Sequence, residues 1–432
     1  MRRLCRLPYA FFFNFIVLFL ACIPISHAQQ ASITYLTHFG GTSPELAVYQ
    51  RLAEAFMAVH PQIDVQVRYP SGNYLEFLKV MIAGGTPPDV TFLANWDIPP
   101  LAEEGLLLPL DSFVARDGYD LDAFFPLTVE VARYRLRSGQ VHLYGIPRHP
   151  SPIAMYYNAS AYERAGLAPP PSGEPADAWT WEAYLENAKR LTVDTNQDGV
   201  PDQFGTQVPR TIPHTLFPVI RSFGGGILDD KTRRTAFNEY TAEALQFLVD
   251  LASVHQVAPR FGAAVPSFAD GGYAMEVNIF PQMGVIHAGV GDSFEWNVAP
   301  MPAGRAGRVN RSVAGTHVIL SASRQPEAAW QFLKFLGSDR AQEIIFEAGV
   351  VMPARISTAR RVFENPPEYM KDKNINVFVE GLLAGGQAEA ILPEWTDIVR
   401  IFTEELNPVW REQSPVTTAL SRIATRVDAL LQ

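Results

Sequence analysis

An acidic stretch at residues 194–202 has the composition that most resembles a metal site. Its oxygen-bearing side chains stand at alternate positions with glycine at the sixth, as at the front of a calcium loop: Asp194, Asn196, Asp198, Gly199 and Asp202. The twelfth position is Gly205, where such a loop needs a bidentate glutamate. We therefore favour a solvated acidic turn, with weak structural calcium binding as the alternative and no other cofactor expected.

Catalytic chemistry has few candidates in this sequence. It contains no nucleophile elbow, HExxH helix, phosphate-binding loop or GxGxxG turn. Both cysteines, Cys5 and Cys22, lie near the N-terminus, so residues 29–432 offer no thiol nucleophile, disulfide or cysteine-bound zinc. Paired carboxylates for glycoside cleavage stay open among the 45 acidic residues, which keeps a carbohydrate-active enzyme as an alternative.

The first 28 residues have the three parts of an export signal. Three arginines open the segment, residues 11–21 are apolar, and Ser26-His27-Ala28 offers small residues at a cleavage site. The apolar run is shorter than the ~20 residues that span a bilayer, which disfavours a retained anchor. We expect a periplasmic protein. Cleavage ahead of Cys22 for lipid attachment is less favoured, because Phe19 stands where that signal usually has leucine.

The charge and length of the remaining chain exclude some classes of function. Residues 29–432 have 32 basic and 45 acidic side chains, a net charge of −13. Binding to a phosphate backbone needs clustered Lys and Arg, so nucleic acid is not expected as a partner. The chain is long enough for two ordinary domains, and its 47% hydrophobic content indicates a globular protein.

The candidate groups must be positioned by an alternation of strands and helices that starts at residue 33. Strands are predicted at 33–36, 63–69 and 89–93, with helices at about 44–59 and 74–84 between them. Short connections of this kind build a parallel sheet covered by helices, an α/β fold. Ligands bind at the carboxyl ends of such strands, here residues 37–41 and 94–97.

A second lobe is predicted beyond a crossing point at residues 144–147. This lobe has a helix capped by Thr180 and another helix near 241–254. Trp179 and Trp181, on either side of the cap, are expected in the core of the lobe. Further elements follow: a strand at 318–320, a helix pair over 326–349, and amphipathic helices at about 395–410 and 416–431.

The order of short motifs along the chain resembles that of a known family. The motifs lie at 33–41, 72–74, 83–90, 101–111, 144–147, 155–158, 165–167, 180–181, 224–229, 272–275, 299–304, 327–333 and 349–355. With them, the chain resembles the extracellular solute-binding proteins of bacterial ABC importers, specifically the carbohydrate-binding family with maltose- and glycerol-phosphate-binding members. The resemblance covers nearly all of residues 29–432.

The resemblance implies a two-lobe periplasmic-binding-protein fold, type II-like, with a ligand cleft between lobes joined by hinge crossovers. Lobe 1 would comprise 29–145 and about 314–360, and lobe 2 would comprise 146–313 and about 361–432. A carbohydrate or polyol that contacts both lobes would favour their closure, and the ABC permease would recognise the closed form. The implied protein is a monomer without catalysis. An exported enzyme, or a sensing protein that feeds a receptor, is the alternative.

A carbohydrate site needs aromatic rings for the sugar faces and planar polar groups for the hydroxyls. In lobe 1 and at its crossover, the candidates are His38, Phe39, Tyr74, Asn95, Trp96 and Ser151. Asn95 and Trp96 are favoured because they end a predicted strand. Tyr74 is equally compatible with a core position, and Ser151 with a hinge-lining one.

In lobe 2, and where the chain returns to lobe 1, the candidates are Phe223, Gly225, Phe280, Gly315, Thr316 and Trp395. Gly225 would bring backbone close to the cleft, and the resemblance implies backbone contacts at Gly315 and Thr316. Leu36 stands where many relatives have tryptophan. Val350-Val351 stands where glycerol-phosphate binders have tyrosine, which weakens that assignment.

Overall fold

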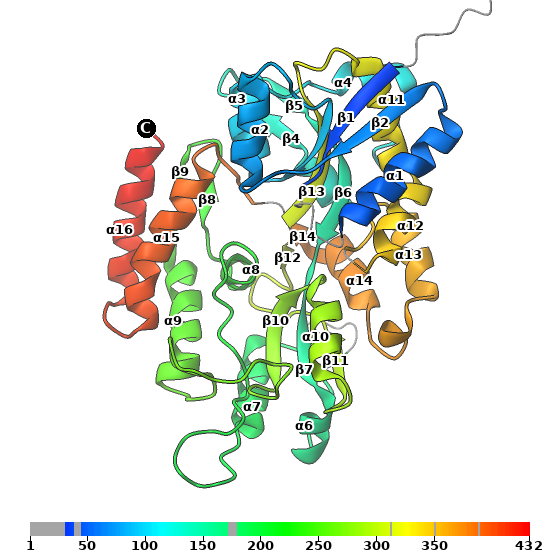
Figure 1. Cartoon of the computed structure of the whole chain (residues 1–432). Helices are drawn as coiled ribbons and strands as arrows, with labels where there is room; N and C mark the ends of the chain where they lie inside the picture. Colours follow the sequence, from blue (N-terminus) through cyan, green and yellow to red (C-terminus); the bar gives the residue numbers. More distant parts are fainter. Residues whose placement is uncertain (1–30, 39–44, 172–178, 312, 350, 388) are drawn as a thin grey trace, which may run out of the picture.

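The structure, a computed structural model, describes residues 31–38, 45–171, 179–311, 313–349, 351–387 and 389–432, which form two lobes (Figure 1). The predicted export signal lies outside these residues, as does Phe39. Among the helices of the described segments, none combines the length and apolar character that a membrane span requires.

Lobe 1 is built on a five-stranded sheet with the order β2-β1-β3-β13-β6. The strands are β1 (Ala31–Leu36), β2 (Ile63–Arg68), β3 (Val90–Ala94), β6 (Gly145–Ser151) and β13 (Val313–Ile319). β1 pairs in parallel with both β2 and β3, and β13 runs antiparallel between β3 and β6. The α/β fold predicted from the alternating pattern is confirmed.

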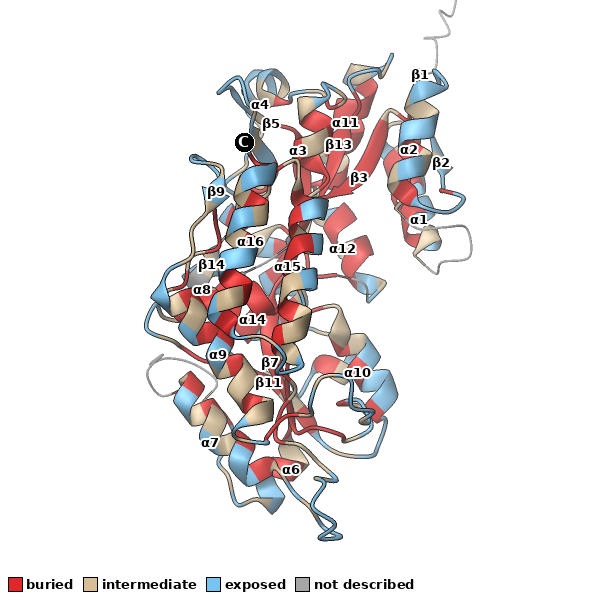
Figure 2. Cartoon of the chain, turned by 90° about the vertical axis from the view of Figure 1, so that its left-hand side faces the viewer, coloured by how far each residue is buried: buried red, intermediate tan, exposed pale blue. Residues whose placement is uncertain are grey.

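Helices cover both faces of this sheet because successive strand residues point to opposite sides. The covering elements are α1 (Leu46–Val59), α2 (Tyr74–Ala83), α3 (Ile98–Glu103), α4 (Asp111–Asp117), α5 (Pro126–Glu130), α11 (Pro326–Leu336), α12 (Asp339–Glu347) and the hairpin β4 (Arg133–Arg135) and β5 (Val141–Leu143). Tyr35 packs with α1 and α11, whereas Leu36 packs with α2 and α3. Figure 2 shows β3 and β13 buried and the outer faces of α1 and α2 exposed.

Lobe 2 has a smaller sheet and more helices. Three antiparallel strands lie in the order β10-β7-β11: β10 (Met275–Ile279), β7 (Ile153–Asn158) and β11 (Trp296–Ala299). Around them lie α6 (Ala159–Arg164), α7 (Trp181–Leu191), α8 (Leu216–Ser222), β8 (Leu228–Asp229), β9 (Arg234–Thr235), α9 (Glu239–Ser253), α10 (Gln282–Val290), α15 (Trp395–Trp410) and α16 (Val416–Leu430). Thr180 caps α7 as predicted, and Trp179 and Trp181 are buried.

The lobes are joined by crossing segments beside one another. β6 leads into β7, and β12 (Asn310–Arg311) leads back toward β13 after pairing with β14 (Gly386–Gln387). The Asn310 side chain bonds the backbone of Ile153 twice, at 3.1 and 2.9 Å. A third segment contains α13 (Ile356–Glu364), a 3-10 helix (Glu368–Met370) and α14 (Asn376–Gly385).

The first crossover lies later than the sequence predicted. The sequence predicts residues 146–151 in lobe 2, but β6 pairs with β13 and so completes the sheet of lobe 1. The chain therefore enters lobe 2 between Ser151 and Ile153. The predicted crossing point at residues 144–147 overlaps β6, and Pro147 and Pro150 are tolerated there because β6 is an edge strand.

Candidate functional site

The two lobes meet at the end of β3. Trp96 follows this strand, is partly buried, and packs against the hydrophobic core of lobe 2. Its ring lies edge-on to the ring of His214, at 6.0 Å between centroids and 71° between planes. His214 belongs to the segment of lobe 2 that precedes α8, so this aromatic contact joins the lobes.

Asn95, next to Trp96, has unused hydrogen-bonding capacity. Asn95 is 2% exposed, and both its amide oxygen and its amide nitrogen have no hydrogen-bond partner among the described residues. A buried amide left unpaired is costly unless something else supplies partners. Asp97 completes the turn; burial raises the pKa of its carboxyl to about 7, against a smaller lowering by a backbone hydrogen bond at Ala94.

A cavity of 520 Å³ lies between the lobes, which we call the interlobe cavity. Its lining includes Asn95, Glu130, Tyr134 and Arg137 from lobe 1, and Asp230, Arg233, Glu389 and Ile391 from lobe 2. The Arg137 Nη2 atom lies 2.5 Å from Oε1 of Glu394, which Arg233 also approaches at 3.0 Å. Burial and the charge of Asp230 raise the pKa of Glu130. Opposite and like charges therefore face each other across the boundary.

A second cavity, of 530 Å³, lies in lobe 2 and reaches the boundary at His214; we call it the lobe 2 cavity. Its lining includes Arg210, Thr211, His214, Glu276, Asn278 and Gln282. Both volumes fall in the range of small-molecule sites, roughly 300 to 1,000 Å³. Amide, hydroxyl and charged groups at an aromatic lobe boundary suit a polar solute with many hydroxyls.

Comparison of the sequence with known proteins identifies the family of this chain. The sequence model of bacterial extracellular solute-binding proteins matches residues 40–343. The chain belongs to this family. The predicted resemblance is therefore confirmed. Since this is a family of binding proteins, the alternative of a carbohydrate-active enzyme is contradicted.

Curated relatives of this solute-binding protein include two with stated sugars. It is 28% identical over 301 residues to the maltotriose-binding protein of Pyrococcus abyssi, covering 67% of this chain and 59% of that one. It is 26% identical over 246 residues to the arabinooligosaccharide-binding protein of Bacillus subtilis, covering 54% and 50%. The chain thus spans less than two thirds of the length of these relatives.

Solved structures share its fold. An ABC substrate-binding protein from Listeria monocytogenes, in complex with cycloalternan, superposes with a TM-score of 0.75 at 22% identity, covering 93% of this chain and 99% of that one. The sugar-binding protein MalE from Xanthomonas citri gives 0.76 at 21% identity, covering 93% and 97%. The predicted two-lobe binding-protein fold is confirmed.

Of the predicted lobe 1 residues, His38 and Tyr74 lie together beside β3. Their ring centroids are 4.7 Å apart, and the His38 ring also meets Phe92 edge-on at 5.2 Å. Burial, and then the charge of Arg148, lower the pKa of His38. The Tyr74 hydroxyl lies 2.6 Å from the Thr91 hydroxyl and also bonds the Phe92 carbonyl, so Tyr74 is held within the lobe.

Three predicted residues lie on the paired strands β6 and β13. Ser151 ends β6 and is buried, and Thr316 is fully buried on β13. Gly315 sits at a register shift between the strands. A Cβ atom there would come within 2.2 Å of both His149 and Phe92, so glycine is required for ring packing. These residues build the hinge side of lobe 1.

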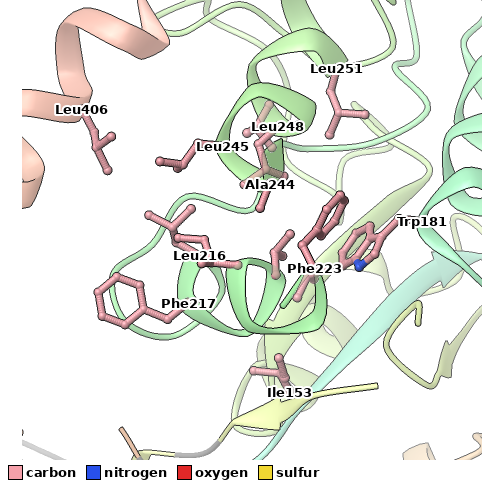
Figure 3. Packing of buried hydrophobic residues seen from close by; sticks show 14 of the residues in the cluster. Ile153, Trp181, Leu216, Phe217, Phe223, Ala244, Leu245, Leu248, Leu251 and Leu406 are labelled. Atoms are coloured by element: carbon pink, nitrogen blue, oxygen red, sulfur yellow. The ribbon is translucent and has the colours of Figure 1, made fainter. Parts of the chain in front are cut away.

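The predicted residues Phe223, Phe280 and Trp395 are buried, and Phe223 and Trp395 belong to the cluster against which Trp96 packs. Phe223 packs against Trp181 within the core (Figure 3), and Trp395 meets Phe217 edge-on at 6.2 Å. Phe280 lies in a different cluster, stacked on Phe363 at 5.9 Å. Gly225 lets α8 approach α9, since a Cβ atom there would come within 2.9 Å of the Thr241 backbone.

The acidic stretch forms an exposed loop whose carboxylates bond its own backbone. Asp194 accepts from the amides of Gln197 and Gly199, at 2.7 and 2.9 Å. Asp202 accepts from the Thr195 amide at 2.7 Å. Within the described ranges, no three His, Cys, Asp or Glu side chains group as a metal site. Weak calcium binding stays the less favoured alternative to a solvated turn, and a calcium titration of the melting temperature would test it.

Sequence reasoning missed Glu276, His214 and the Arg137–Glu394 pair. Glu276 belongs to a short strand whose alternation predicts faces but not what each face meets. The ion pair joins residues 257 positions apart, so no local signal could indicate it. His214 follows a proline in a stretch without periodicity.

Proposed function

We propose that this solute-binding protein is the substrate-binding component of an ABC importer and captures a sugar or sugar-like solute by lobe closure. One observation carries the proposal: Trp96 of lobe 1 meets lobe 2 beside the buried, unpaired amide of Asn95. An aromatic face and a free amide are the two kinds of group that a sugar ring requires. The stated ligands of the relatives, maltotriose and arabino-oligosaccharides, support the same class.

The cellular setting belongs to the same proposal. The protein is exported through the signal of residues 1–28 and works as a soluble periplasmic monomer, with lipid attachment at Cys22 as the less favoured form. A solute that contacts both lobes stabilises the closed arrangement by its higher affinity for it. The membrane permease then receives the closed protein.

A thermal-shift screen of residues 29–432 tests the substrate class. The panel contains maltotriose, arabino-oligosaccharides, monosaccharides, polyols and sugar phosphates, with peptides as the opposing set. At a hundredfold excess over Kd, a binding solute adds about 2.7 kcal/mol to the free energy of unfolding. A shift with peptides and none with any sugar or polyol would overturn the proposal.

Trp96→Ala then tests the site. Loss of the ring that bridges the lobes should lower the affinity for the best-binding saccharide by at least about tenfold, since burial of such a ring contributes roughly 1.5–3 kcal/mol. The matched control is Trp410→Ala, which removes a partly buried tryptophan at the end of α15. Equal affinities of the two variants would place the sugar elsewhere.

A further inference from the structure

Glu276 is a buried acid that faces the lobe 2 cavity. It lies on β10, is 5% exposed, and lines the cavity with Asn278, Arg210 and Gln282. The Asn278 amide donates to Oε1 of Glu276 at 2.9 Å. Burial raises the pKa of Glu276, and hydrogen bonds from Asn278 and Tyr273 lower it by less.

No cation balances this carboxyl group within the described part of the chain. Among the described residues, no ion pair involves Glu276 and no Lys or Arg charge contributes to the shift of its pKa, although Arg210 lines the same cavity. The Arg210 guanidinium instead lies over the ring of Phe261, 4.6 Å from its centroid. Both donors to Glu276, an amide and a phenol, are neutral. A carboxylate taken from water with only neutral partners is left with a large desolvation cost.

A ligand with a positive charge would remove that cost where a neutral ligand would not. An ammonium group placed in the cavity forms a charge-assisted hydrogen bond with Glu276, roughly twice as strong as a neutral one. The surrounding amides and hydroxyls of Asn278, Gln282 and Thr211 suit the hydroxyls of a sugar ring.

We propose that the lobe 2 cavity selects a saccharide with a free amino group, whose ammonium pairs with Glu276. This inference rests on the proposed function, because it names the class of sugar that the same protein captures. Specificity then comes from the difference in binding free energy between the two kinds of sugar, because a neutral or N-acetylated sugar leaves Glu276 buried without a counter-charge.

Titration calorimetry at pH 7 with matched probes tests the inference. The probes are glucosamine against N-acetylglucosamine and glucose, and the chitosan trimer against its fully N-acetylated form. We expect the Kd of each amine to be at least about tenfold lower than that of its acetylated partner. Equal or tighter binding of the acetylated or neutral form overturns the inference and leaves the proposed function standing. Absence of binding by any saccharide, charged or neutral, overturns both.

Variants assign the preference to Glu276. Glu276→Gln keeps the shape and should bring amine and acetylated forms within about twofold of each other, whereas Glu163→Gln, an exposed glutamate on α6, should leave the preference intact. A retained preference in Glu276→Gln overturns the inference. If that variant does not fold, Gln282→Lys gives the same test, because it places a competing ammonium in the cavity. An undiminished preference of Gln282→Lys for the amine would also overturn the inference.

Discussion

The end of β3 in lobe 1 and β10 in lobe 2 each have an amide and a buried acid two residues apart. In lobe 2 the two side chains are hydrogen-bonded to each other, since the Asn278 amide donates to Glu276 at 2.9 Å. In lobe 1, Asn95 has no side-chain partner in the described structure and Asp97 has only a backbone one. The two pairs therefore combine the same kinds of group, an amide and a carboxyl, but only the lobe 2 pair is joined by a side-chain hydrogen bond.

The difference separates two tasks within one binding protein. A satisfied pair is already oriented, so a ligand meets it without reorganisation. An unsatisfied pair at the lobe boundary gains its partners only when a solute is present. Lobe 2 thus offers an acid and an amide that already orient each other, and lobe 1 offers hydrogen-bonding capacity that favours the ligand-bound arrangement.

Asp97→Asn is the change with the largest expected effect on this comparison. The folded protein holds the Asp97 proton up to about pH 7, while the unfolded chain releases it near 3.8. The free energy of unfolding therefore falls as pH rises from about 4 to 7, by up to about 4 kcal/mol, and stays lower above pH 7. The Asn variant lacks this loss. Urea unfolding at pH 4, 5.5, 7 and 8 should show its advantage growing with pH.

Asp292→Asn is the matched control for that experiment. Asp292 is exposed in the turn after α10, so the same chemical change should leave the pH profile of the wild type unaltered. If Asp97→Asn also followed the wild-type profile, Asp97 would be ionised in the folded protein. Burial would then not hold the Asp97 proton, and the proposed contrast between the two lobes would fail.

A pair of isosteric changes compares the two amides directly. Asn278→Leu removes a donor from a buried carboxyl group and should lower the free energy of unfolding by about 1.5–3 kcal/mol. Asn95→Leu removes two unpaired buried atoms and should be neutral or stabilising, while it weakens saccharide binding several-fold. Guanidinium unfolding at pH 7 and calorimetry measure the two effects. Equal destabilisation by both changes would show that Asn95 is satisfied after all.

The sequence predicted β1, β2 and β3 of lobe 1, and hence Asn95 and Trp96 at a strand end, because period-two and helical patterns are local. It placed only residues 318–320 in β13 and did not predict β6 as a strand of this sheet. It could not separate aromatic residues that face a boundary from those that fill a core. Trp96 and Phe223 both follow regular elements beside polar or glycine residues. Only packing in three dimensions sends Phe223 against Trp181 and leaves Trp96 between the lobes.

Arg137→Ala has the smallest expected effect and tests whether the boundary itself contributes to binding. The Arg137–Glu394 pair joins the β4–β5 hairpin of lobe 1 to the start of α15 in lobe 2. Arg137 is 58% exposed, and such pairs contribute at most about 1 kcal/mol. Because the contact exists only where the lobes meet, its loss should weaken saccharide binding roughly two- to fivefold and leave the unligated melting temperature unchanged.

Arg305→Ala separates this effect from a general loss of surface charge. Arg305 pairs with Glu243 at the same 2.5 Å, with both side chains 47% exposed, but the pair lies entirely within lobe 2. Calorimetry in 20 mM and 500 mM salt should show the Arg137 effect shrinking as screening increases, since the Debye length falls from tens of ångströms to a few. Arg305→Ala should bind like the wild type at both. If the two variants weakened binding equally, the Arg137–Glu394 pair would not stabilise the arrangement in which the lobes meet. Closure would then depend on the solute alone.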